Sequence, residues 1–119
     1  NPLSVADCAA AIAAIDICDS DEGLTLLKTL KDRTTQFRNG LQNLGLESIP
    51  GPHPVVPLMV RETQQTHNLV KYLYNNGVLV VGLAFPVVPK GDETIRFQVN
   101  ACHTSTDINY VLNLLFKFK

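Results

Sequence analysis

The sequence has no long apolar run and no strong charge of either sign. No stretch approaches the roughly 18 apolar residues that suggest a membrane span. Residues 1–4 lack the basic segment that precedes the apolar stretch of a signal peptide. The formal net charge of −1 provides neither a basic field for nucleic acid nor an acidic tail. We therefore expect a cytoplasmic protein that binds neither membranes nor nucleic acids.

Cysteine is scarce, and the residues of a self-contained active site are missing. Cys8, Cys18 and Cys102 include no pair at metal-ligand spacing, so no metal is predicted, and we expect buried, reduced thiols. His53 and His67 are expected to be surface or structural histidines. The chain has no glycine-rich phosphate loop and no nucleophile elbow. We therefore predict no catalytic residue within it.

The composition is that of an ordinary globular domain. The 119 residues are 45% hydrophobic and 18% charged, which suffices for one core. We predict a single domain over residues 1–119. Because the chain opens on Asn1 without an initiator Met and enters a helix almost at once, we expect a piece of a longer protein. The alternative is a complete small protein that has lost its first residues.

Apolar periodicity predicts four helices and three strands. The helices are expected at residues 4–19, 24–44, 66–76 and 104–115, and the strands at residues 55–60, 78–83 and 94–100. Ser4 and Thr104 are the expected N-caps, and Gly45 the expected left-handed stop of the second helix. The first two helices, joined by a short polar turn, are expected to pack on each other or on a sheet.

These elements predict an α+β fold whose helices pack around a three-stranded sheet. The loop between the last two strands is too short for a helical crossover, so the sheet is expected to be at least partly antiparallel. The apolar, β-branched segment 78–83 is expected to be a buried strand. Residues 49–57 contain four prolines and are expected to form a loop that leads into the first strand.

The last strand carries the one candidate binding residue. Ile95, Phe97 and Val99 alternate with Arg96, Gln98 and Asn100, so the polar residues share one face of the sheet. An arginine held by a sheet can meet a carboxylate in fixed bidentate geometry. From spacing alone, a solvated Arg96 in an ordinary surface ion pair is the commoner arrangement.

Longer motifs change that balance. Residues 82–91 read Gly-Leu-Ala-Phe-Pro-Val-Val-Pro-Lys-Gly, and they are followed by Arg96 and by Ala-Cys-His-Thr at residues 101–104. Phe37-Arg38 with Leu41 and Gly45, and His53-Pro-Val-Val-Pro, precede them in matching order. In this combination the chain resembles the C-terminal part of the α-oxoamine synthases, pyridoxal-phosphate enzymes of fold type I. Cys102 departs from the small Ala or Gly that is usual there.

The resemblance implies the small C-terminal domain of a fold type I enzyme that joins an amino acid to an acyl-coenzyme A. In the family, the arginine at the position of Arg96 binds the carboxylate of the amino-acid substrate. Lys90 is then a candidate contact for coenzyme A, although a solvated loop lysine is the more ordinary role. His103 is expected to have a structural role beside the last helix. The loop is most like that of glycine C-acetyltransferase, with 8-amino-7-oxononanoate synthase and serine palmitoyltransferase second.

The resemblance also implies what lies elsewhere. The family's Schiff-base lysine, ring-stacking histidine and pyridine-pairing aspartate belong to contexts that this sequence does not contain. We therefore expect pyridoxal phosphate to be bound mainly by a large domain, the full enzyme to be a homodimer, and this piece alone to be inactive. An ordinary aminotransferase of the same fold and a stand-alone interaction module remain as alternatives.

Overall fold

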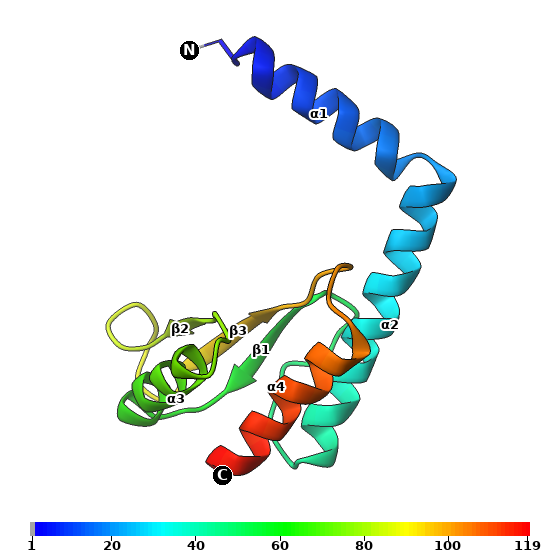
Figure 1. Ribbon diagram of the computed structural model, residues 1–119. Coiled ribbons are helices and arrows are strands. Elements are labelled where there is room, and N and C mark those ends of the chain that lie inside the picture. Colours follow the sequence, from blue (N-terminus) through cyan, green and yellow to red (C-terminus); the bar gives the residue numbers. More distant parts are fainter. Residues whose placement is uncertain (1) are drawn as a thin grey trace.

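The computed structural model describes residues 2–119 and contains the predicted order of elements (Figure 1). The helices are α1 (Val5–Cys18), α2 (Asp21–Asn43), α3 (Thr63–Asn75) and α4 (Ser105–Phe118), and the strands are β1 (Val55–Met59), β2 (Val81–Leu83) and β3 (Thr94–Gln98). The predicted α+β class is confirmed. Among these described helices, none is both long and apolar enough to cross a membrane.

The three strands form a fully antiparallel sheet in the order β1-β3-β2. The direct connection from β2 to β3 makes them a hairpin, as the short intervening sequence predicted. β3 is the central strand, and it pairs Arg96 with Pro57 on one side and with Val81 on the other. This register fixes which side chains share a face, because successive residues in a strand point to opposite sides.

One face of the sheet holds the core. Leu58 is paired with Ile95 and Val56 with Phe97, and all four side chains are buried. Helices α2, α3 and α4, together with Val99 just after β3, supply the other apolar side chains of the cluster. The Phe37 and Phe97 rings meet with centroids 5.1 Å apart. The core thus confirms the predicted inward positions of β3 (buried residues of the cluster: Phe37, Leu41, Val56, Leu58, Leu69, Leu73, Ile95, Phe97, Val99, Ile108, Leu114, Leu115).

A glycine lets α3 approach the hairpin. Gly82 is paired with Ile95, so a side chain there would point to the core face. A Cβ atom at this position would lie 2.7 Å from Cγ2 of Val70 on α3, which is closer than carbon atoms pack. Residue 82 therefore sets the distance between the edge strand and its covering helix.

The proline-rich segment before β1 is organised by an arginine of α2. The Arg38 guanidinium donates to the backbone oxygens of Ile49 at 2.7 Å and of His53 at 2.8 Å. The backbone N–H of Val55 in turn donates to His53 Nδ1 at 3.1 Å. Prolines remove backbone donors, and these side chains tie the segment to the fold in their place. His53 therefore has the structural role that was predicted.

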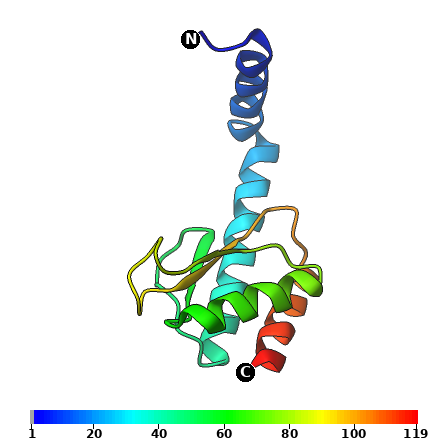
Figure 2. The same cartoon turned by 90° about the vertical axis from the view of Figure 1, so that its left-hand side faces the viewer.

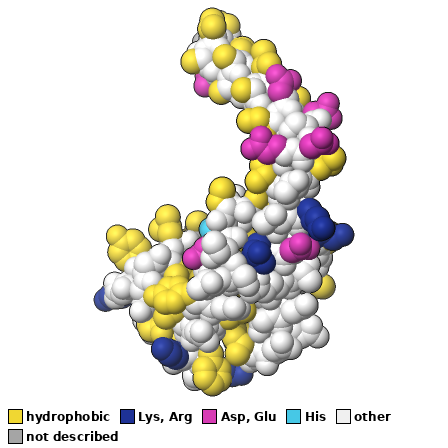
Figure 3. Space-filling view, turned by 45° about the vertical axis from the view of Figure 1, so that its right-hand side comes forward, with side chains coloured by type: hydrophobic (Ala, Val, Ile, Leu, Met, Phe, Trp, Pro, Cys, Tyr) yellow, Lys and Arg dark blue, Asp and Glu magenta, His cyan; other side chains and the backbone are white. Residues whose placement is uncertain are grey.

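The prediction that α1 packs on α2 or on the sheet is wrong. Figures 1 and 2 show α1 leaning away from the body of the protein, and it buries none of its residues. The radius of gyration, 16.8 Å, exceeds the about 13.5 Å expected of a compact chain of this length. Apolar side chains are visible on the face of α1 that Figure 3 shows. Because the helix is apolar along most of its sequence, no single stripe directs it to one surface.

Three other expectations also need correction. The segment 78–83 is not a buried strand, because β2 lies at the sheet edge with Leu79 85% and Val81 59% exposed. Leu27 contributes to the apolar periodicity that predicted the helix at residues 24–44, and such residues are expected to be buried, yet Leu27 is 55% exposed. The cysteines are exposed rather than buried. Cys8 and Cys18 lie on α1, which buries nothing, and Cys102 lies in the turn before α4.

Candidate functional site

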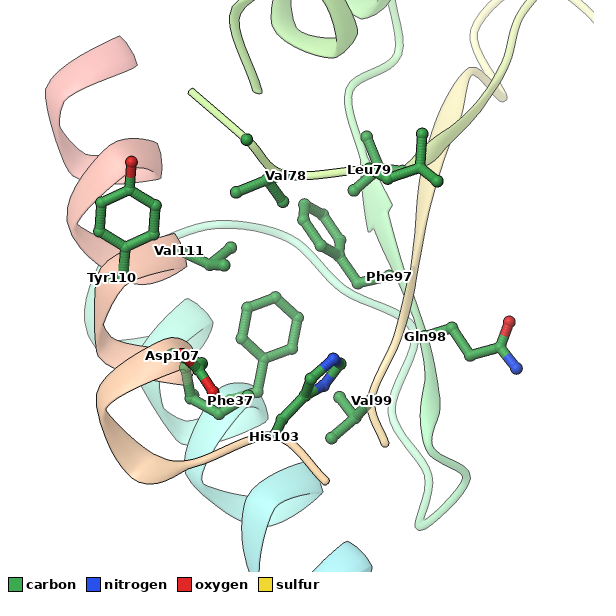
Figure 4. Close-up of a pocket in the computed structure, with 13 residues that line it drawn as sticks. Phe37, Val78, Leu79, Phe97, Gln98, Val99, His103, Asp107, Tyr110 and Val111 are labelled. Carbon is green, nitrogen blue, oxygen red and sulfur yellow. The ribbon is translucent and has the colours of Figure 1, made fainter. Parts of the chain in front are cut away.

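Arg96 lies at the centre of the uncovered face of the sheet. Its neighbours across the register are Pro57 and Val81, so apolar side chains flank the guanidinium on both adjacent strands. Arg96 is exposed, while the residues before and after it are buried in the core. Figure 4 shows Gln98, which shares this face, pointing away from Phe97 and His103. Arg96 is therefore not packed beneath α4.

The guanidinium of Arg96 is available to a ligand. Within residues 2–119 the Arg96 side chain makes no hydrogen bond and no ion pair, whereas Arg38 donates to backbone oxygens and Arg61 pairs with Glu47. A strand backbone paired on both sides holds its Cα, since β3 is the central strand. The described residues thus present a fixed arginine on an open surface, which is the geometry that a small carboxylate requires.

A cavity of about 350 Å³ lies on the other side of the sheet, between β3, α4 and the segment before β2 (Figure 4). Its walls are mainly apolar and include Phe37, Phe97 and Val111, together with His103 and Asp107. Arg96 is not among its lining residues. The cavity and the candidate binding residue therefore belong to opposite faces.

The polar groups at this cavity are occupied by local structure. His103 Nδ1 accepts the backbone N–H of Asn100 at 3.1 Å. The backbone N–H of His103 donates to the backbone oxygen of Asn100, which closes the turn before α4. Asp107 accepts the Thr104 N–H at 2.8 Å and completes a capping box. The Thr104 backbone N–H and hydroxyl hold the pKa of Asp107 below its ordinary value. His103 thus has a structural role beside α4, and Thr104 is the N-cap, as predicted.

Lys90 lies in the exposed loop between β2 and β3. Its Nζ atom is 5.2 Å from the centroid of the Phe85 ring, a cation–π contact within the same loop. The strand residue nearest the loop, Thr94, is two positions from Arg96, which corresponds to about 7 Å along a strand. Lys90 and Arg96 therefore belong to the same hairpin, but the described structure shows no contact between their side chains.

The carboxylate that holds this loop was not predicted from the sequence. Glu93 is only 1% exposed, and its side chain accepts hydrogen bonds from the Thr63 hydroxyl and the Gly91 N–H, each at 2.8 Å. The hydrogen bond from Thr63 is the main cause that holds the pKa of Glu93 below its ordinary value, and the Gly91 N–H adds to it. An acidic residue beside a loop is usually solvated, so sequence alone favoured the opposite environment.

An ion pair between Arg61 and Glu47 lies next to Glu93. Arg61, in a left-handed conformation with φ 65°, donates from Nε to Glu47 at 2.8 Å and from Nη1 to the Gly91 oxygen at 3.2 Å. The Arg61 hydrogen bonds hold the pKa of Glu47 below its ordinary value. Both groups are half exposed, so this pair contributes little to stability. The geometry of the pair matters more than its energy, because Arg61 also binds Gly91 in the loop between β2 and β3.

The family model for aminotransferase class I and II matches residues 1–115 of this sequence. The chain belongs to that family. Among the family's curated members, it is 33% identical to an 8-amino-7-oxononanoate synthase of Thermosipho melanesiensis, over 94% of this chain and 28% of that protein. It is 29% identical to the human mitochondrial 2-amino-3-ketobutyrate coenzyme A ligase, over 91% of this chain and 25% of that protein. The predicted resemblance to the α-oxoamine synthases is confirmed.

Solved structures agree on the fold. A structure of SPT with PLP internal aldimine superposes with a TM-score of 0.76 at 20% identity, over 81% of this chain and 25% of that chain. The 8-amino-7-oxononanoate synthase of Francisella tularensis gives 0.75 at 18% identity, over 92% of this chain and 31% of that chain. The predicted fold type I architecture is confirmed. The chain spans about a quarter of the length of the curated relatives it matches.

The described residues by themselves do not fit pyridoxal phosphate, the cofactor that the family implies. A lysine that carries this cofactor must face an enclosed site, and no lysine lines the 350 Å³ cavity. Among residues 2–119, the basic side chain that lines this cavity is His103, which already accepts the Asn100 N–H, while Arg96 lies exposed outside it. No step of a cofactor reaction can therefore be assigned to this chain.

Proposed function

We propose that this chain is the small C-terminal domain of a pyridoxal-phosphate-dependent acyl-coenzyme A:amino acid C-acyltransferase, and that Arg96 binds the carboxylate of the amino-acid substrate. The observation that carries the proposal is the position of Arg96: fixed on the central strand, exposed and without an internal partner in residues 2–119. The relatives of the family, which include a ligase named for coenzyme A, support the reaction class.

Arg96 would act by orientation. Its planar guanidinium can donate two parallel N–H···O bonds to a carboxylate, and the sheet fixes the position of its Cα. A hydrogen bond to a charged group is worth roughly 1.5–3 kcal/mol. This hydrogen-bond energy would hold the substrate in one orientation beside the reacting centre, and that orientation lowers the activation barrier of the reaction. Pro57 and Val81, its register neighbours, would keep water from part of the pair.

Lys90 would meet the other substrate. The primary amine of Lys90 lies at an exposed loop on the same hairpin as Arg96, where it can approach the phosphates of an acyl-coenzyme A. The α-carbon of the amino acid would lose a proton, or its carboxyl group as carbon dioxide, and would bond to the acyl carbon of the thioester. The bond from the acyl carbon to the coenzyme A sulfur would break, and the thiolate would take up a proton and leave as the free thiol. Pyridoxal phosphate would be held by the remaining three quarters of a family-length protein. Such an enzyme would be a homodimer in the cytoplasm.

Two branches of the family have specific support. The residues of the loop at 82–91 favour glycine C-acetyltransferase, the activity otherwise called 2-amino-3-ketobutyrate coenzyme A ligase. The higher identity to 8-amino-7-oxononanoate synthases favours that branch, with 33% against 29%. A panel of acetyl, pimeloyl and palmitoyl thioesters offered to the longer protein, with released thiol as the readout, decides between them. An ordinary aminotransferase, or a non-catalytic interaction module, would release no thiol with any of the three.

The arginine assignment is tested by Arg96→Ala in the longer protein. Loss of the carboxylate contact should raise the KM for the amino acid about 10- to 100-fold, while the KM for the thioester stays within about twofold. Gln98→Ala is the matched control, because Gln98 is exposed on the same face of the same strand. An unchanged amino-acid KM in the Arg96 variant would reject the carboxylate role.

A further inference from the structure

Glu93 is a buried carboxylate, and its burial requires a physical explanation. It immediately precedes β3 and is 1% exposed, yet within residues 2–119 it forms no ion pair. A buried carboxylate is costly unless hydrogen bonds replace its water. Here Oε1 accepts from the Thr63 hydroxyl of α3 and Oε2 from the Gly91 N–H, each at 2.8 Å. The carboxylate therefore joins the start of α3 to the loop that carries Lys90.

The loop end is held through both backbone polar groups of Gly91. The Gly91 N–H donates to Glu93, and the Gly91 oxygen accepts from Arg61 at 3.2 Å. The backbone oxygen of Glu93 in turn accepts the N–H groups of Val60 and Arg61, at 2.9 and 3.0 Å. These bonds fix Gly91 relative to the end of β1, although Gly91 itself has a φ of 95° and so a wide conformational range.

The rest of the loop is less restrained. Phe85 is 52% and Val87 74% exposed. The backbone bonds described inside it are short-range, from Val87 N–H and Val88 N–H to Ala84 and from Asp92 N–H to Pro89. The backbone of Lys90 is thus positioned by the neighbouring Gly91, which Glu93 and Arg61 hold. The Lys90 ammonium group contacts the Phe85 ring.

We propose that Glu93 is a positioning residue: by holding the Gly91 N–H it fixes the loop so that the Lys90 ammonium is presented to the phosphates of the acyl-coenzyme A. This inference rests on the function proposed above and deepens it, since it assigns the geometry of the thioester site to a residue that touches neither substrate. Hydrogen bonding carries the effect. An amide at position 93 can accept from Gly91 and donate to the Thr63 hydroxyl, so Gln fills the same role.

The kinetic test uses the longer protein with Glu93→Ala, Glu93→Gln and Asp92→Ala. Glu93→Ala should raise the KM for the acyl-coenzyme A about fivefold to tenfold, with the amino-acid KM unchanged. Glu93→Gln should restore the wild-type value within about twofold. Asp92→Ala removes an adjacent exposed carboxylate and is the matched control for charge. A rise of both KM values together, or no rise of either, overturns the proposal.

Two further measurements separate its failure from that of the proposed function. In a Lys90→Ala background, Glu93→Ala should add no further increase in the acyl-coenzyme A KM, because the effect passes through Lys90; additive increases overturn the inference. Amide hydrogen exchange at Gly91 in this 119-residue chain should be faster in Glu93→Ala than in Asp92→Ala. Equal exchange rates overturn the Glu93 role even if thiol release supports the enzyme. Failure of all thiol release, with faster exchange, overturns the reaction and the Lys90 contact to coenzyme A that depends on it, and leaves only the bond from Gly91 to Glu93.

Discussion

Helices α1 and α4 have the same length and opposite surroundings. Each contains 14 residues and each begins at a hydroxyl N-cap, Ser4 or Thr104. Yet α4 buries Ile108, Leu114 and Leu115 against the body, whereas α1 buries nothing. In α4 the apolar residues recur on one face. In α1 Asp7 and Asp16 are the charged residues and all the others are Ala, Ile, Val or Cys, so apolar groups face every side.

The difference shows that apolar content and apolar direction are separate properties. A helix with one apolar stripe has one way to bury it, and α4 is oriented accordingly on α2 and the sheet. Its first turn is also held by Gln36, whose amide donates to Ser105 Oγ at 2.9 Å and to Asn109 Oδ1 at 3.0 Å. A helix that is apolar all round needs partners on several sides, and residues 2–119 do not supply them to α1.

The largest expected contrast is in the cost of side-chain truncation. Leu115→Ala should lower the free energy of unfolding by about 2–5 kcal/mol, because Leu115 is 3% exposed and leaves a cavity. Ile12→Ala, at a position 62% exposed, should change it by no more than about 0.5 kcal/mol. Urea unfolding of the two variants measures both. Comparable losses would mean that α1 is packed in solution.

A smaller contrast is expected at the N-caps. Thr104→Ala removes the side-chain partner of the Asp107 N–H, at 3.1 Å, and should cost about 1 kcal/mol of global stability. Ser4→Ala removes the equivalent acceptor of the Asp7 N–H, at 3.0 Å, but should reduce only the helicity of α1. Circular dichroism and the unfolding midpoint separate local from global loss. Equal midpoint shifts would contradict the independence of α1.

The smallest effect is expected with pH. The pKa of folded Asp107 lies below its ordinary value of 3.8, so its stabilisation is fully present above that value and is lost as the pH falls through the folded pKa. Asp107→Asn should therefore be less stable than the wild type at pH 6, and the two should converge in strong acid. Unfolding midpoints at pH 6, 4 and 3 measure this, and a constant difference across them would exclude the carboxylate as the cause.

The sequence predicted Arg96 better than it predicted the residues around it. Strict alternation over residues 95–99 decides which side chains are buried, because a strand has a period of two, and the structure bears this out. The loop at residues 85–92 was also recognisable from its prolines. Glu93, by contrast, carries no such signal: its burial depends on Thr63 and Gly91, which are 30 and 2 positions away in the chain.

Local rules therefore determined the helices, the strands, their order and the face of β3 on which Arg96 stands, since hydrophobic period and capping act over a few residues. Only the tertiary structure decided that α1 lacks a partner within residues 2–119, that β2 lies at an edge, and that Glu93 rather than solvent holds Gly91. Each of these depends on which distant surfaces meet. Burial and hydrogen-bond partners are properties of that meeting and not of any residue taken alone.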